Sequence, residues 1–500
     1  MRMFHKTFSG PSGPRPVTTH VGMTGGRALR QFSRRDFLRS TAELGTAAAM
    51  TCLIPGCGSG PNQVAEQPKA KRPNVVVILI DTLRADKLGC YGCGEDTSPE
   101  IDYYAASGTR FDRVVAQCSW TRPSIGSMLT SVYPRTLGLY VERNQTLPEE
   151  FVTLAEILRK HGYYTASLVS NANINRVFGF AQGFDYYLDV DPESAWGWMP
   201  EARPIVENGR KQRKMVRTSR QLYERALGLA TMTPPEKSVF LFFTVMEVHE
   251  RSYANGRIIR PALRSLYPQS KSQRYLQSVR QVSRDTGEFL RQLLSLPGWE
   301  DTLVVITSDH GEGLKDHPNV RDSESHGRLL YESQVLVPLI FYHHGRNLGG
   351  EVIKPPVRLL DMMPTILDYV SVPIPDQCVG MSLCRHMRGQ AGENEFPTEF
   401  MMETHRFSNM VGIYGDQWYY VVSRQNRRPW GTAEIELQEI GVKADGQRTN
   451  RLRSHPKVAR DLAERLAAWQ KAYPPRPPTP RGSAIPEHER KVLRSMGYVG

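Results

Sequence analysis

A run of apolar, β-branched residues beginning abruptly at position 74 constrains the fold of this chain most strongly. Residues 74–80 read Asn-Val-Val-Val-Ile-Leu-Ile, with no polar side chain after the first. Such a run is typical of a strand buried on both faces, as in a parallel sheet. The sequence therefore predicts a mostly parallel sheet, to which similar runs would add strands at Tyr164–Ser170, Val239–Met246, Thr302–Thr307 and Val337–Tyr342.

Helix-like segments lie between these runs, at Thr153–His161, Gln273–Leu296 and Leu360–Tyr369. Strands that alternate with helices predict an α/β fold in which helices sandwich the sheet. From about Gly389 the pattern changes to shorter strands and one late helix, Lys457–Tyr473. We therefore expect a small antiparallel α+β subdomain at the C-terminal end, with strands at Met410–Ile413 and Trp418–Val422.

The N-terminal region has the features of an export signal. Residues 33–39 read Ser-Arg-Arg-Asp-Phe-Leu-Arg, which resembles the twin-arginine export motif. A weakly apolar run from Leu44 to Pro55 follows, too short to span a bilayer. Residues 54–57, Ile-Pro-Gly-Cys, resemble a lipobox, in which Cys57 would be acylated. We expect an exported, periplasmic or cell-envelope protein with a membrane tether through Cys57.

The basic charge of the chain does not indicate a nucleic-acid partner. The net charge is +13, but residues 1–57 hold eight Arg and Lys against two acids, and residues 471–500 hold six against two. The positive charge therefore lies mainly at the two ends. Five cysteines follow Cys57, an odd number that predicts no disulfide framework.

Reactive side chains follow three of the predicted strands. Asp81 comes directly after the first strand, Asp309 and His310 after Thr302–Thr307, and His249 shortly after Val239–Met246. In open α/β sheets, functional groups collect beyond the carboxyl ends of the strands. Any one of these residues alone would be explained by a capping acid or a surface histidine. Three at corresponding strand ends instead predict a common site.

Several motifs follow one another along the chain: Ile80–Gly92, Ser308–Glu312, His326–Glu332, Asp361–Thr365, Gly380–Leu383 and Met496–Tyr498. In this order they resemble the signatures of the sulfatase family, within the alkaline-phosphatase-like superfamily. The resemblance extends over roughly residues 73 to 500 and implies an alkaline-phosphatase-like α/β fold and a metal-dependent hydrolase of sulfate or phosphate esters.

The nucleophile segment departs from the family pattern. Sulfatases carry Cys/Ser-x-Pro-x-Arg before a helix that ends Leu-Thr-Gly, and the Cys or Ser is oxidised to formylglycine. Counting back from Leu129 and Thr130 places Thr121 at the nucleophile position and Ile125 at the Arg position, while Cys118 lies three residues too early. Threonine cannot become formylglycine, because its β-carbon bears a methyl group. The resemblance therefore implies direct attack by the Thr121 hydroxyl, with an ordinary helix cap as the alternative role.

The resemblance also implies a metal. Asp81, Asp309 and His310 are the expected ligands, and the imidazole shifts the expected divalent cation towards Zn²⁺ or Mn²⁺, with Ca²⁺ as the alternative. His249 matches a substrate-side histidine that could protonate the leaving oxygen. His326 stands where many sulfatases place an anion-binding Lys, and with His249 and Glu247 it is an alternative ligand set for a second metal. The family's Gly-Lys-Trp-His segment is Val169–Ala172 here, without its Lys and His.

These observations leave three functions open. The first is hydrolysis of a sulfate or phosphate ester, the second a phosphodiesterase or phosphotransferase acting on cell-envelope lipids or polymers, and the third an inactive sulfatase-like binding protein. The expected organisation is a twin-arginine signal with a lipobox-like end (1–57), a linker (58–72), a sulfatase-like catalytic domain (73–388), a C-terminal subdomain (389–473) and a Pro-rich linker and tail (474–500).

Overall fold

The computed structural model describes most of the chain after residue 70. The described residues are 71–140, 145–189, 204–207, 210–213, 218–250, 253–254, 257–258, 270–320, 323–392, 395–397, 399–405, 408–423, 432–440 and 450–477. The predicted signal at 1–57 with Cys57, nearly all of the linker and most of the tail at 474–500 lie outside them. None of the described helices is both long and apolar enough to cross a membrane.

An eight-stranded sheet forms the centre of the fold, in the order β14-β2-β13-β11-β1-β8-β4-β5. The five strands from β11 to β5 pair in parallel, which confirms the predicted parallel sheet. The strands are β1 (Asn74–Ile80), β2 (Thr109–Phe111), β4 (Tyr164–Val169), β5 (Tyr186–Leu188), β8 (Val239–Val245), β11 (Thr302–Thr307), β13 (Leu339–His344) and β14 (Glu351–Ile353).

One predicted strand runs in the opposite direction to the others. The apolar run Val337–Tyr342 corresponds to β13, and β13 pairs antiparallel with both β11 and β2. Two parallel strands need a crossover connection, which brings the chain back to the end of the sheet where the first strand began. Among its described residues, the connection after β11 has one helix, the single-turn α10 (Glu332–Val335), and it re-enters the sheet at the end where β11 finished. This connection carries several candidate site residues.

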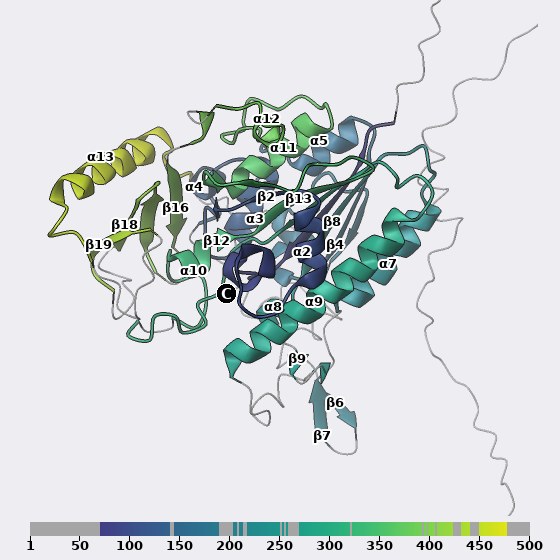
Figure 1. The fold of residues 1–500 in the computed structure, drawn as a ribbon, viewed down its shortest axis with the longest axis horizontal. Helices are drawn as coiled ribbons and strands as arrows, with labels where there is room; N and C mark the ends of the chain where they lie inside the picture. The colour runs from purple at the N-terminus through teal and green to yellow at the C-terminus, as the bar shows by residue number, and fades with distance from the viewer. Residues whose placement is uncertain are drawn as a thin grey trace, which may run out of the picture. The chain divides into compact units, whose positions relative to one another are not determined.

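Helices cover both faces of the sheet (Figure 1). Alternate side chains of β1 enter different cores: Val75, Val77 and Leu79 pack with α3 (Thr121–Thr130), α5 (Leu154–Lys160) and α11 (Met362–Tyr369). Val76, Ile78 and Ile80 pack with α2 (Pro99–Ala106), α7 (Ser219–Met232) and α9 (Lys271–Leu294). All six side chains are fully buried, which explains the unbroken apolar sequence of the strand.

A second, antiparallel sheet follows near the C-terminal end, as predicted. Its order is β16 (Phe400–Thr404), β17 (Met410–Tyr414), β18 (Trp418–Ser423) and β19 (Ile435–Glu439). The helix α13 (Pro456–Ala472) packs its apolar stripe against one face of this sheet. The other face packs on Leu329, Leu330 and Tyr331, so it supports the long connection after β11.

The remaining elements are short. They are η1 (Ala85–Lys87), η2 (Gly89–Tyr91), β3 (Val114–Val115), α4 (Pro134–Leu137), η3 (Ala172–Ile174), η4 (Arg176–Phe178), β6 (Pro204–Glu207), β7 (Arg210–Arg213), α8 (Glu247–Glu250), β9 (Tyr253–Ala254), β10 (Arg257–Ile258), β12 (Leu336–Val337), β15 (Val357–Arg358), η6 (Leu359–Asp361) and α12 (Cys384–Met387).

Candidate active site

The ends of β1 and β11 bring two carboxylates and an imidazole together. The two strands are parallel neighbours with Leu79 opposite Thr307, so Asp81 and Asp309 follow at the same level of the sheet edge. One candidate ligand atom from each of Asp81, Asp309 and His310 lies within 4.8 Å of the others. All three side chains are fully buried. The structure thus places these three predicted ligands in one cluster.

The donor atoms in this cluster fit a cation. Asp81 Oδ1 and Asp309 Oδ2 are buried and have no hydrogen-bond partner among the described residues, although His310 Nε2 lies 3.3 Å from Asp309 Oδ2. Burial, and next the charge of Asp309, raise the pKa of Asp81 to about 7. Two buried carboxylates that repel each other are stabilised by a positive charge between them. The chemistry of the cluster therefore suits a divalent cation.

Thr121 lies beside this cluster at the start of α3. Its Oγ1 is 3.4 Å from His310 Nε2, and the hydroxyl of Ser124 donates to the main-chain oxygen of Asp309 at 2.6 Å. The helix begins at Thr121 itself, after the extended residue Trp120. Thr121 is therefore the first helical residue, so the alternative of an ordinary helix cap does not describe it.

Two residues near Thr121 face away from the cluster. Ile125, one turn further along α3, is fully buried in the apolar core between the helix and the sheet. Arg122 is also buried, and its guanidinium lies over the Phe178 ring at 3.5 Å and donates from Nε to Asn173 O at 2.9 Å. The Ile125 and Arg122 side chains are thus both engaged in packing.

Asn171 is a site residue that the sequence interpretation missed. Its Nδ2 donates to Asp81 Oδ2 at 2.5 Å and lies 3.4 Å from Thr121 Oγ1. Its Oδ1 accepts from the main-chain N–H of Asn173, which fixes the orientation of the amide. The residue follows β4, so the strand-end rule that selected Asp81 also applied to it. The family pattern at residues 169–172 indicates only that its Lys and His are missing, and it gives no role to Asn171.

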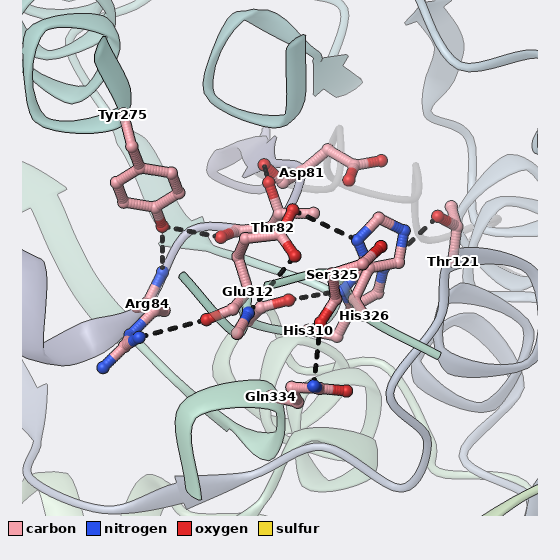
Figure 2. A network of polar contacts seen from close by, with 12 residues as sticks. Asp81, Thr82, Arg84, Thr121, Tyr275, His310, Glu312, Ser325, His326 and Gln334 are labelled. Carbon is pink, nitrogen blue, oxygen red and sulfur yellow. Dashed lines mark hydrogen bonds and ion pairs between the residues drawn. The ribbon is translucent and has the colours of Figure 1, made fainter. Parts of the chain in front are cut away.

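A row of imidazoles extends from the cluster. The His326 ring lies between those of His310 and His249, with centroid separations of 4.6 and 5.1 Å. His326 Nδ1 is 3.3 Å from Glu312 Oε2, as Figure 2 shows. Burial lowers the pKa of His326 to about 4 against the opposing charge of Glu312. A neutral His326 does not supply the positive charge of the Lys expected at its position.

Glu247 is not arranged as the sequence suggested. Its Oε1 accepts from the main-chain N–H of Ser219 at the start of α7, and burial raises the pKa of this carboxyl to about 7. The acid therefore supports the beginning of a helix. The acid held next to His326 is Glu312, so the second-metal set with Glu247 is not the arrangement observed.

Gln334 holds the loop that carries His326 through hydrogen bonds to main-chain groups. The side chain is fully buried, donates from Nε2 to Ser325 O at 2.8 Å and accepts at Oε1 from Leu329 N at 3.3 Å. Its main-chain oxygen accepts from Gly311 N at 2.9 Å. A Cβ at Gly311 would lie 2.1 Å from Ser333 O, so this close approach requires glycine. Residues on both sides of His326 are thus tied to the segment that carries His310.

Comparisons with known proteins give the family and the fold of the chain. A family model described as Sulfatase matches residues 73–372. An ulvan-active sulfatase from Formosa agariphila is 26% identical over 370 residues, covering 69% of this chain and 71% of the relative. A Δ4,5-hexuronate-2-O-sulfatase from Bacteroides thetaiotaomicron is 24% identical, covering 79% and 88%. The fold also matches a phosphonate monoester hydrolase from Silicibacter pomeroyi, with a TM-score of 0.60, 17% identity and coverage of 81% and 96%.

The match to the family model covers most of the region that the resemblance indicated. The chain belongs to the sulfatase family of hydrolases, with the alkaline-phosphatase-like arrangement of a mostly parallel sheet and a small antiparallel C-terminal sheet.

Proposed function

We propose that this protein is a metal-dependent hydrolase of sulfate or phosphate esters in which the Thr121 hydroxyl is the nucleophile. The observation that supports this most directly is the position of Thr121 Oγ1, 3.4 Å from His310 within a cluster of buried acids. The start of α3 adds the positive end of the helix dipole, which favours a tetrahedral anion beside the hydroxyl.

Asp81, Asp309 and His310 would hold the cation, and Asn171 would orient Asp81 towards it. A divalent cation there would add positive charge next to the ester and lower the pKa of a neighbouring hydroxyl. The mixed carboxylate and imidazole set favours Zn²⁺ or Mn²⁺ over Ca²⁺.

The remaining residues would act on the ester and its products. Thr121 would release its hydroxyl proton to solvent and attack the sulfur or phosphorus atom, forming a covalent ester as the bond to the leaving oxygen breaks, and a protonated His249 would give its proton to that oxygen. Water then hydrolyses the ester and frees Thr121. His326, neutral and held by Glu312, would position the substrate oxygen rather than neutralise its charge.

The small number of cationic side chains at the site supports a narrower choice of substrate. Positions where the motif comparison expects Arg, Lys and His are occupied by Ile125, Ser170 and Ala172. Fewer cations favour an ester with one negative charge, either a sulfate monoester or a phosphate diester, over a doubly charged phosphate monoester. The names of the sulfatase relatives support a sulfated sugar, whereas a hydroxyl nucleophile supports a phosphate diester, including one in a cell-envelope lipid or polymer.

The test combines elemental analysis of the purified protein with three aryl substrates: a sulfate, a phosphodiester and a phosphate monoester. We expect about one zinc or manganese per chain and turnover of the sulfate or the diester in preference to the monoester. Binding of an ester without turnover of any would favour an inactive sulfatase-like binding protein. Preference for the monoester would contradict the argument from charge.

We also propose export by the twin-arginine route and tethering through Cys57. Replacing Arg34 and Arg35 together by Lys should leave unprocessed precursor in the cytoplasm, and Cys57→Ala should release exported protein from the membrane fraction. Normal export of the double variant would rule out the route.

A further inference from the structure

We infer that Tyr275 on α9 is a positioning residue for the metal ligand Asp81, because its hydroxyl clamps the strained turn that follows β1. The inference rests on the proposed metal site and extends it to a helix that contributes none of the proposed ligands.

The turn is strained at Thr82. This residue has a φ of +61°, the left-handed region that β-branched side chains rarely adopt. It is fully buried and directly follows Asp81. Its hydroxyl donates to Asp81 O at 2.6 Å, which compacts the turn further. Such strain persists only where neighbouring groups hold it, and it is common at functional sites.

Tyr275 provides that restraint from outside the turn. Its hydroxyl donates to Thr82 O at 2.7 Å and accepts from Arg84 N at 2.9 Å, so one side-chain atom joins two main-chain groups of the turn (Figure 2). Tyr275 is fully buried. Water therefore does not readily replace its hydroxyl, and either main-chain group left without a partner would be costly.

Other contacts connect the turn to the second strand of the cluster. The Ser308 hydroxyl accepts from Leu83 N at 2.9 Å, and Asp309 Oδ1 accepts from Thr82 N at 3.4 Å. The left-handed conformation thus directs the Thr82 N–H towards Asp309 and its carbonyl towards Tyr275. If the turn relaxed to a negative φ, both bonds would break and the Asp81 carboxylate would move relative to Asp309.

The helix that carries Tyr275 is suited to this role. α9 has 24 residues, and its first residue, Lys271, pairs with Glu324 at 2.6 Å, two positions before His326. One long helix therefore contacts both the Asp81 turn and the His326 loop.

The chain offers a matched control. Tyr223 on α7 is also buried, and its hydroxyl bonds to Thr286 Oγ1 of α9 at 3.0 Å, away from the turn. We compare Tyr275→Phe with Tyr223→Phe, each as the full chain stripped of metal and titrated with Zn²⁺ against a chelating dye. The absorption spectrum of the Co²⁺-loaded protein reports ligand geometry. The melting temperature of each metal-free protein reports folding.

We expect Tyr275→Phe to bind Zn²⁺ about 10- to 100-fold more weakly and to change the Co²⁺ spectrum, as loss of a residue behind a metal ligand does. Tyr223→Phe should match the wild type in both. Thr82→Gly provides a second test, because glycine adopts the positive φ without strain. Tyr275→Phe should therefore weaken Zn²⁺ binding less in the Thr82→Gly background than in the wild type.

Unchanged Zn²⁺ affinity and Co²⁺ spectrum in Tyr275→Phe would overturn the inference and leave the proposed function intact. Equal losses in both tyrosine variants would also overturn it, because packing alone would then explain them. Failure of the wild type to bind Zn²⁺, Co²⁺ or Mn²⁺ would instead remove the proposed metal site, and the inference with it.

Discussion

The Thr121 side chain cannot become the formylglycine of a sulfatase. It keeps a hydroxyl, but the methyl group on its β-carbon prevents oxidation to an aldehyde. Its position at the first residue of α3, next to His310, makes the hydroxyl accessible to the cluster without a role in capping. Under the proposed function, a directly attacking hydroxyl at this one residue takes the place of formylglycine.

Thr121→Ala should lower kcat by about three orders of magnitude or more, because it removes the attacking atom and leaves the metal ligands in place. Thr121→Ser should retain measurable turnover. Thr121→Cys should not form formylglycine efficiently, since Ile125 stands where the motif has Arg. Kinetics with the aryl sulfate and the aryl phosphodiester, alongside Zn²⁺ titration as the control, measure these effects. Equal turnover by wild type and Thr121→Ala would show that the hydroxyl is not the nucleophile.

Much of the site at this scale follows from position along the sequence. Asp81, Asp309 and His310 each lie within three residues of the end of a strand whose apolar run is unmistakable. Asn171 follows a strand too, but its amide suggested no chemistry until its contact with Asp81 was known. Tyr275 lies inside a helix far from the motifs. Its hydroxyl acts on main-chain groups, which no sequence pattern specifies.

Among the elements, the connection between β11 and β13 decides where His326 lies. The apolar run predicted the strand but not its direction, because direction depends on how the chain returns to the sheet. The same connection holds His326 by contacts on either side of it. Gln334 makes two of these contacts from within the connection.

Gln334→Ala should destabilise the fold by about 1–3 kcal/mol, because buried main-chain groups lose their partners. It should also lower kcat by about 10- to 100-fold as His326 moves. Gln377→Ala is the control, since Gln377 similarly joins two main-chain oxygens, that of Thr130 at the C-terminal end of α3 and that of Val152. That variant should lose stability and keep its kcat. Similar kcat values for the two variants would argue against a role for Gln334 in placing His326.

For the molecule as a whole, one buried histidine remote from the site should contribute to the loss of stability in acid. His343 on β13 is fully buried at the end of the sheet opposite the site, with Nε2 3.2 Å from Asp301 Oδ1. Burial lowers its pKa to about 4, although Asp301 opposes the shift. The unfolded chain, with a histidine pKa of about 6.5, therefore takes up a proton that the folded chain excludes.

The free energy of unfolding should consequently fall as the pH drops from about 6.5 to about 4, with part of the fall due to His343. His343→Phe should flatten this part of the curve. Chemical denaturation at pH 7.5, 6, 5 and 4 measures the difference between the two proteins. Identical slopes would show that His343 takes up its proton without unfolding.

The in-register pairing of β1 with β11 has a consequence for how the chain can vary. Thr82 and Asp309 are 227 positions apart, yet the cluster joins the two ends of that segment. A cation held there would close a very long loop, and the entropic cost of loop closure rises only with the logarithm of loop length. Residues inserted within the enclosed segment, away from the strands, should therefore hardly change the free energy of closing this loop. The loops of this segment can therefore be enlarged or trimmed without redesigning the cluster of Asp81, Asp309 and His310.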